Sequence, residues 1–337
     1  MRMLTRQRTW LGCRAGSWLG KLASAVLALV LLGSLPTLAQ TWPNRPVKVI
    51  MATAAGSAPD VIARIVTDRL SQIWGQQILI LNRPGAGGLI AMQALAAAER
   101  DNHTLYLPSS SSLVVLPETN SKLPFDLQRD LVPIGLVGEQ PFMIVVGNHV
   151  GVNTLPELIA LAKSKPGEVT YAANFRGSLP NMTGEMFASA AGVKLTFVPY
   201  PGAPPSLQDL MGGRISMMVE GIAAFTAALQ SNSAKPLAVT SPQRLSNHPN
   251  VPIVAETLPG YTSRGWFAFL ALTGTPDDVV RKVNADLKTV LEIPEVKSRF
   301  ETLATYVRQL SPAETGQYIR AEQDAWRPIV KQFGVTN

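Results

Sequence analysis

The sequence predicts an α/β protein made of two domains. Short β-branched runs alternate along the chain with segments whose apolar residues recur at helical spacing, which is typical of a largely parallel sheet covered by helices. The chain has 337 residues, 46% of them hydrophobic, and this is enough for two cores of ordinary domain size. Glycine and proline occur 26 times each, between the periodic segments, as they do at turns.

The N-terminal segment is predicted to be a signal peptide. Its first 40 residues contain five bases and no acid, and an apolar run from Leu22 to Leu32 is followed by a small-residue pattern that ends at Ala39. The apolar run has about 11 residues, whereas a membrane-spanning helix needs about 20. We therefore predict that residues 1–39 are cleaved after Ala39 and that the rest is exported as a soluble protein.

The net charge does not indicate a nucleic-acid partner. The formal charge is +7, but five of these positive charges lie in the predicted signal peptide and leave +2 for the remainder. The single cysteine, Cys13, lies in the same segment. The exported chain would therefore have neither a disulfide nor a thiolate nucleophile.

Three strands and two helices are predicted in the first 112 residues. The strands span 47–52, 78–81 and 104–107, and the helices span 61–70 and 89–99. The strands are followed by small-residue or polar loops at 53–60, 83–88 and 109–112. Strands that alternate with helices in this way favour parallel pairing.

The rest of the chain continues the alternation. Two strand-like runs separated by Gly138 to Pro141 are predicted between Leu131 and Val146, and Thr154 with Glu157 fits a capping box. Further strands are predicted at 169–172, 195–199, 215–219, 235–240 and 265–272, and helices at 181–191, 206–211, 276–291, 295–303 and 312–333. We identify no internal repeat.

Three polar loops are candidates for binding an anion. They are Thr53 to Asp60, Ser109 to Ser112 and Asn174 to Asn181, and each follows a predicted strand and opens a helix. Backbone N–H groups at a helix start point outward, and the helix dipole favours negative charge there. The sequence therefore predicts a carboxylate ligand at these loops.

No constellation for catalysis, metal or cofactor binding is evident. The loop 83–88 lacks the Lys-Ser/Thr of a phosphate-binding loop, and we interpret it as a tight turn. His103, His149 and His248 each stand alone near a turn and are predicted to be surface residues. Asp60 and Glu185 as a hydrolytic pair have a simpler explanation as acids near helix starts. We therefore expect no catalytic residue, no metal and no cofactor.

Five stretches of the sequence resemble the Bug receptors, the periplasmic binding components of tripartite tricarboxylate transport systems. The resemblance extends from about Trp42 to the C-terminal helices. The matching stretches are Trp42 to Ile50, Gly56 to Arg64 with Asp60 and Ala63 in place, Asn82 to Gly88, Pro199 to Gly202, and Leu207 to Gly213.

The resemblance implies a periplasmic-binding-protein fold of type II, a Venus flytrap of two α/β domains joined by a hinge. We place the domains at residues 40–145 with 267–337 and at residues 146–266. It also implies a monomeric receptor that binds a small carboxylated compound and delivers it to membrane permease subunits. The ligand-binding residues implied or predicted are Thr53, Ala54, Gly56, Ser57, Asp60, Ser109, Ser110, Asn174, Phe175, Arg176, Ser178, Asn181, Tyr200 and Gly202.

Departures from the family pattern leave the ligand open. The first loop reads Ala54-Ala55-Gly56-Ser57-Ala58-Pro59-Asp60 where the family usually has Pro-x-Pro-Pro-Gly-Gly, and Asn181-Met182 replaces a His-Leu pair. One hypothesis is that Phe175 and Arg176 face the cleft and favour a second acidic group or an aromatic ring. The alternative is that Arg176 is a solvated loop residue.

Two other functions stay open at this point. A sensory receptor that presents its ligand to a membrane kinase needs the same cleft and two states. An exported α/β enzyme is the less favoured alternative, because the sequence offers no nucleophile, metal site or cofactor loop.

Overall fold

The computed structural model describes residues 42–120, 122–124 and 126–333. The predicted signal peptide at 1–39 and Cys13 lie outside the described residues. By its internal contacts, Pro43–Asn337 forms one compact unit, so the division into two domains stays a prediction. None of the helices in the described ranges combines the length and the apolar character needed to cross a membrane.

The strands lie close to their predicted positions, with one exception. In the described residues they are β1 (Val47–Met51), β2 (Ile78–Asn82), β3 (Thr104–Leu107), β4 (Leu131–Gly147), β5 (Thr170–Ala173), β6 (Thr196–Pro199), β7 (Met217–Gly221), β8 (Ala234–Val239) and β9 (Arg264–Leu272). The exception is β4, a single strand of 17 residues where we predicted two runs.

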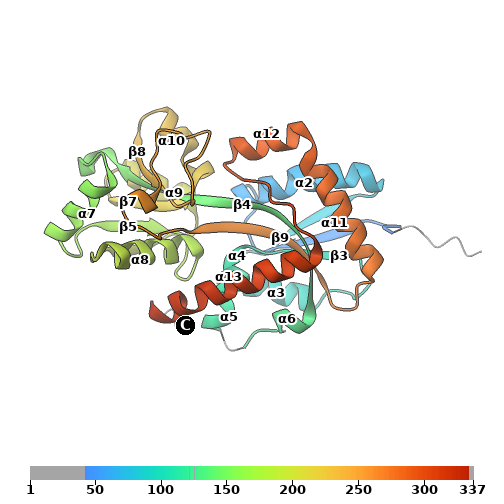
Figure 1. Cartoon of the computed structure of the whole chain (residues 1–337). Helices are drawn as coiled ribbons and strands as arrows, with labels where there is room; N and C mark the ends of the chain where they lie inside the picture. Colours follow the sequence, from blue (N-terminus) through green and yellow to red (C-terminus); the bar gives the residue numbers. More distant parts are fainter. Residues whose placement is uncertain (1–41, 121, 125, 334–337) are drawn as a thin grey trace, which may run out of the picture. The chain divides into compact units, whose positions relative to one another are not determined.

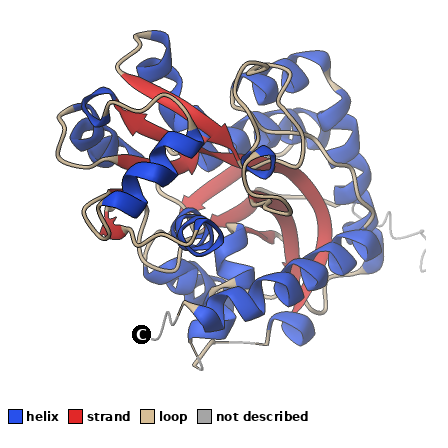
Figure 2. Cartoon of the chain, turned by 60° about the vertical axis from the view of Figure 1, so that its left-hand side comes forward, coloured by secondary structure: helices blue, strands red, loops and turns tan. Residues whose placement is uncertain are grey.

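The sheet is mixed, so the expectation of a largely parallel sheet was wrong. The strand order is β2-β1-β3-β9-β4-β7-β5-β6, with β8 also paired to β4. β1 pairs with β2 and β3 in parallel, as β5 does with β6 and β7, but every pairing of β4 and β9 is antiparallel. Figure 2 shows the helices packed around these strands.

β4 and β9 cross between two groups of strands. β4 pairs with β9 as far as Pro141 opposite Arg264, and from Phe142 onward it pairs with β7. We call residues 43–141 with 264–333 the first half, and residues 142–263 the second half. Figure 1 shows β4 and β9 running from one half to the other.

The predicted break in β4 is absorbed by irregular pairing. The register with β9 shifts between Leu136 and Gly138, and a Cβ atom at Gly138 would lie 2.8 Å from Thr305 Cγ2. The strand bends there without ending, as strands do at bulges. Glycine and proline in this segment therefore marked an irregular crossing strand and not a turn.

The helices mostly begin near their predicted starts. They are α2 (Ala58–Trp74), α3 (Leu89–Ala96), α4 (Ser110–Val114), α5 (Leu116–Thr119), α6 (Leu127–Asp130), α7 (Leu155–Ser164), α8 (Leu179–Ala191), α9 (Ala203–Met211), α10 (Thr226–Gln230), α11 (Asp277–Glu292), α12 (Pro294–Thr302) and α13 (Pro312–Gln332), with 3₁₀ turns η1 (Ala86–Gly88), η2 (Asn148–Val150), η3 (Ile222–Phe225) and η4 (Val254–Glu256). Most of the predicted serine loop at 109–112 is thus the start of α4.

The helix start at α7 forms as predicted, with one different partner. The Thr154 hydroxyl accepts a hydrogen bond from the Glu157 N–H at 3.3 Å. The Glu157 carboxylate accepts from the N–H of Asn153 and not from that of Thr154. The cap is therefore present, but its reciprocal bond is displaced by one residue.

Both faces of the second-half sheet are buried. Met217, Val219 and Tyr171 belong to a core cluster that continues into the first half. Met218, Met143 and Phe225 belong to a separate cluster on the opposite face. Side chains alternate between the two faces of a strand. In β7, Met217 and Val219 therefore face the first cluster, and Met218 and the residue two positions after it face the second.

Candidate functional site

The predicted ligand-binding residues lie at the carboxyl ends of the parallel strands. Thr53 to Asp60 follows β1, Ser109 follows β3, Asn174 to Asn181 follows β5, and Tyr200 to Gly202 follows β6. Ligands of α/β proteins bind at this edge because the loops that connect strands to helices gather there.

Asp60 fixes the shape of the first loop. Its side chain is 2% exposed, and its oxygens accept hydrogen bonds from Gly56 N, Arg64 Nε and Asn82 Nδ2, each at 2.9 Å. Burial alone would raise the pKa of this carboxyl, but the hydrogen bonds from Arg64, Gly56 and Asn82 outweigh it and lower the pKa. Its oxygens are thus used inside the protein.

No side chain of the described residues caps the start of α2. The Ser57 hydroxyl donates back to the Ala54 carbonyl at 2.7 Å and does not bond to the helix. Thr53 Oγ1 is buried and finds no hydrogen-bond partner among the described residues. Uncapped N–H groups at a helix start are available to an anion.

The second loop closes on itself more completely. Gly177 N donates to Asn181 Oδ1 at 2.9 Å, and the Ser178 hydroxyl caps α8 by accepting from Asn181 N at 3.3 Å. Asn181 is fully buried, and its Nδ2 donates to the Tyr171 hydroxyl at 2.8 Å. Its amide therefore joins the turn to β5.

The two loops share a five-residue pattern. Gly56-Ser57-Ala58-Pro59-Asp60 corresponds to Gly177-Ser178-Leu179-Pro180-Asn181, and the first glycine has φ +79° in one and +83° in the other. In both, the glycine N–H bonds to the side chain four residues later. This short repeat was visible in the sequence, and we did not identify it there.

Loops from the two halves touch. Leu179 N donates to Ser111 Oγ at 3.0 Å, and both residues are buried. A Cβ atom built at Gly87 would lie 3.8 Å from Phe175 Cε2, so the aromatic ring lies beside the glycine-rich turn. Ser111 and Gly87 were not among the predicted site residues, although both lie in the predicted loops 109–112 and 83–88.

Ser109 and Ser110 bond within the first half. Ser109 Oγ lies 3.1 Å from Ser112 Oγ, and Ser110 Oγ accepts from Trp266 N at 3.2 Å. Ser110 is 4% exposed. The Ser110 hydroxyl therefore links α4 to β9.

Asn174 and Tyr200 lie in one row of the second-half sheet. Ala172 of β5 is in register with Val198 of β6, and two residues further this register places Asn174 beside Tyr200. The Tyr200 hydroxyl donates to Asp209 at 2.7 Å, and burial together with this bond raises its pKa to about 12. Gly202 follows as the N-cap of α9.

Phe175 and Arg176 differ in their surroundings. The Phe175 side chain is 44% exposed. The Arg176 guanidinium carbon lies 5.1 Å from the ring centroid of Phe197 on β6, a cation–π contact within the second half. The guanidinium is thus held against an edge strand.

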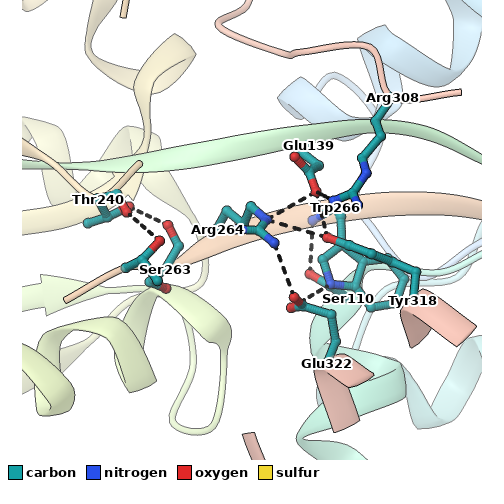
Figure 3. A network of polar contacts seen from close by, with 10 residues as sticks. Ser110, Glu139, Thr240, Ser263, Arg264, Trp266, Arg308, Tyr318 and Glu322 are labelled. Carbon is teal, nitrogen blue, oxygen red and sulfur yellow. Dashed lines mark hydrogen bonds and ion pairs between the residues drawn. The ribbon is translucent and has the colours of Figure 1, made fainter. Parts of the chain in front are cut away.

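A polar network lies where β4 and β9 cross. Arg264 Nε lies 3.1 Å from Glu139 Oε1 and 3.4 Å from the Tyr318 hydroxyl, and its Nη2 lies 3.5 Å from Glu322. Arg308 also bonds to Glu139. Figure 3 shows Arg264 directed between the two glutamates. This cluster of two bases and two acids joins both crossing strands to α13.

Two cavities lie away from the predicted loops. One, of about 520 Å³, is lined by residues that include Asn148, Lys235 and His248, and the other, of about 60 Å³, lies between α13 and β4. Neither is lined by a predicted ligand-binding residue.

One histidine prediction was wrong. His103 is 8% exposed, and its N–H donates to Asp101 just before β3. The start of β3 therefore buries a ring that we expected at the surface. Across the described ranges, no three side chains of His, Cys, Asp or Glu group as metal ligands.

Comparisons with known proteins agree on one family. The model of the family described as tripartite tricarboxylate transporter family receptor matches residues 62–335 of this chain. The structure of the periplasmic binding protein BugD superimposes with a TM-score of 0.79 at 27% identity, covering 88% of this chain and 99% of BugD.

Two related structures contain a ligand. Rpa4515 of R. palustris, with adipate, has a TM-score of 0.81 at 28% identity and covers 86% of this chain and 97% of its own. MatC (Rpa3494) of Rhodopseudomonas palustris, with bound malate, has a TM-score of 0.78 at 28% identity and covers 86% and 100%.

Proposed function

The chain belongs to the tripartite tricarboxylate transporter receptor family, and from this premise we propose that it captures a small carboxylated compound between its two halves and delivers it to a tripartite transporter. As a member of this family of periplasmic binding receptors, it is a solute-binding protein and not an enzyme. The ligand-binding residues, the delivery to membrane subunits and the N-terminal signal peptide are parts of the proposal.

The hydrogen bond between Ser111 and Leu179 carries the proposal. It joins the carboxyl-end loops of one half to those of the other, so a solute bound among these loops would be enclosed from both sides. Enclosure between two halves is how binding proteins of this class retain a solute.

The first loop supports an anionic ligand. The dipole of α2, a helix of 17 residues, favours negative charge at its start, and Ser57 leaves that start without a side-chain cap. The buried Thr53 hydroxyl adds a polar atom with no partner in the described part of the chain. Two relatives have a carboxylate in their structures, adipate in one and malate in the other.

The crossing strands are the proposed hinge. The predicted domain boundaries, between 145 and 146 and between 266 and 267, lie within four residues of the crossing at Pro141 and Arg264. Both boundaries lie within strands, so β4 and β9 connect the proposed domains along the chain. The Arg264 network would then set how far the two halves separate.

A carboxylate panel tests ligand capture. We expect at least one of malate, adipate, acetate and benzoate to raise the melting temperature of the purified mature protein. A ligand at 100 times its dissociation constant stabilises the folded state by about 2.7 kcal/mol. No shift with any of the four would contradict binding of a small carboxylate.

Transport is tested by reconstitution. Vesicles that contain the membrane subunits should accumulate the bound carboxylate only when the purified protein is added on the outer side. Accumulation that is unaffected by its omission would contradict delivery.

The role proposed for Arg176 has its own test. The Arg176 guanidinium packs on Phe197 in the structure. If it also contacts a second acidic group of the solute, Arg176→Ala should weaken binding of malate or adipate and leave benzoate unaffected. Equal affinities of the variant and the wild type for all three would remove the arginine from the site.

A further inference from the structure

The side-chain carboxyl group of Glu220, near the end of β7, has no role in the site described above. Glu220 pairs with Met143 of β4, and its Oε1 accepts a hydrogen bond from Gly221 N at 2.9 Å. Its Oε2 is enclosed and has no hydrogen-bond partner within residues 42–120, 122–124 and 126–333. An unpartnered buried oxygen is costly, which makes a missing partner the question to answer.

Glu220 completes the row formed by Tyr200 and Asn174. Ala172 of β5 is in register with Met218 of β7, so two residues further Asn174 lies beside Glu220. Tyr200 directly after β6, Asn174 directly after β5 and Glu220 in β7 therefore follow one another along the carboxyl edge of the second-half sheet. Two of them were predicted to bind the ligand, and the third was not.

No ionised partner is provided by the elements packed on β7. Residues 142–147 of β4 and 222–225 of η3 contain no titratable side chain. Glu185 of α8 bonds to Tyr171 on the other face of the sheet, and Asp209 of α9 bonds to Tyr200 and Arg214. Burial raises the pKa of Glu220 to about 7, although the Gly221 N–H and the Asn174 side chain lower it in part.

The free oxygen is the one that holds the proton. Oε1 already accepts from a backbone N–H, so in the neutral acid the proton lies on Oε2, which then becomes a donor. An ionised Glu220 would instead repel a nearby carboxylate. A neutral carboxyl that donates is therefore the form compatible with an anionic solute.

We propose, on the basis of the function proposed above, that the protonated Oε2 of Glu220 donates a hydrogen bond to a carboxylate oxygen of the bound solute. A Glu220 that is ionised in the free protein takes up a proton from solvent when the solute binds. Solute affinity is therefore coupled to pH, and Glu220 selects a carboxylate over a group that only donates hydrogen bonds.

Titration calorimetry at pH 6 and pH 8.5 tests this role, with whichever of malate, adipate, acetate or benzoate binds most tightly as the probe. With the carboxyl pKa at about 7, and only the protonated form binding the solute, we expect the wild-type affinity to fall by about 30-fold between the two pH values. A further set of titrations at pH 7, in buffers of different ionisation enthalpy, should reveal proton uptake on binding.

Two variants make the test specific. Glu220→Gln presents an N–H donor at every pH, so it should keep the pH 6 affinity and lose the pH dependence and the proton uptake. Glu185→Gln, a change to the carboxyl on the opposite face, should keep both. The melting temperature of each variant without ligand establishes that it is folded.

The outcomes separate this role from the proposed function. If a probe binds but wild type and Glu220→Gln share the same pH dependence, the glutamate does not contact the solute and the proposed function stands. Affinity that rises with pH in the wild type, with binding lost in folded Glu220→Gln, would assign Glu220 to a cationic group and overturn this role. If no probe binds at either pH, both proposals fail.

Discussion

The loops Gly56–Asp60 and Gly177–Asn181 have the same sequence pattern and the same turn, but they are held by different partners. Asp60 is ionised and bonds to Arg64 and Asn82 in its own half. Asn181 is neutral and bonds to Tyr171. Local sequence therefore builds the turn, and the neighbours decide what the turn can still bind.

The helix starts that follow these loops differ in the same way. Ser178 caps α8, and the Ser111 hydroxyl accepts a hydrogen bond from the Leu179 N–H. Ser57, in contrast, does not cap α2. Backbone N–H groups at the start of α8 therefore already donate to side chains, whereas those at the start of α2 have no side-chain acceptor among the described residues. We infer that the first loop provides the backbone donors for an anion, and that the second provides a fixed wall.

The largest expected effect is that of Asp60→Ala. It removes the buried partner of Arg64 and leaves the N–H groups that donate to Asp60 without an acceptor. The free energy of unfolding should therefore fall by about 3 kcal/mol. Urea unfolding measures it. Asp278→Ala, which removes an exposed acid from the first turn of α11, should cost less than about 0.5 kcal/mol. Equal losses would contradict the role of Asp60.

Low pH should remove the stabilising contribution of the same ion pair. The lowered folded-state pKa of Asp60 means that its contribution is fully present above the unfolded-state pKa of about 3.9 and is lost as the pH falls through the folded value. Asp60→Asn should therefore lose less stability than wild type between pH 5 and pH 2, as measured by urea unfolding at each pH. A parallel fall in both proteins would argue against it.

Asn181→Ala is expected to cost about 2 kcal/mol. It leaves the Gly177 N–H without its acceptor and the Tyr171 hydroxyl without the amide donor, in a fully buried place. The exposed Asn153 serves as the control, since Asn153→Ala removes only a surface bond to Lys235. A loss as small as that of the control would show that the second loop is not fixed by its asparagine.

Ser111→Ala tests the contact between the halves. The Leu179 N–H would lose its acceptor, and we expect a loss of about 1 kcal/mol together with a larger radius of gyration in solution scattering. Ser206→Ala removes a buried hydroxyl that bonds only within the second half, so it should leave the radius unchanged. An unchanged radius of gyration in both variants would show that this hydrogen bond does not hold the two halves together.

The smallest effect compares the two N-cap serines. Ser178→Ala should cost about 1 kcal/mol, because it removes a cap, and Ser57→Ala should cost only a few tenths. We expect Ser57→Ala, despite its small effect on stability, to change affinity for the carboxylate more than Ser178→Ala does. The reverse order would mean that the second loop is the anion site.

The sequence predicted the order of elements and most of their bounds, because these depend on nearby residues. Strand β3 forms where Thr104 to Leu107 predicts it, and the cap at Thr154 forms as its spacing indicates. The continuous β4 was missed because its Gly138 to Pro141 segment is read locally as a turn, and only pairing with β9 keeps it extended.

Partners distant in sequence explain the other omissions. Ser111 lies 68 residues from Leu179, and Glu220 reaches Asn174 only through the register of β5 with β7. His103 is buried although a turn precedes it. No local pattern distinguishes these residues from other polar residues in loops and strands.

From the sequence alone follow the succession of strands and helices and the place of the polar loops after the strands. Periodicity, capping and turn chemistry act over a few residues, and so they can be deduced from neighbours in the chain. Tertiary structure alone decided which polar atoms have partners among the described residues and which, such as Thr53 Oγ1 and Glu220 Oε2, have none there. Hydrogen-bond saturation depends on burial and on groups contributed by other strands and helices.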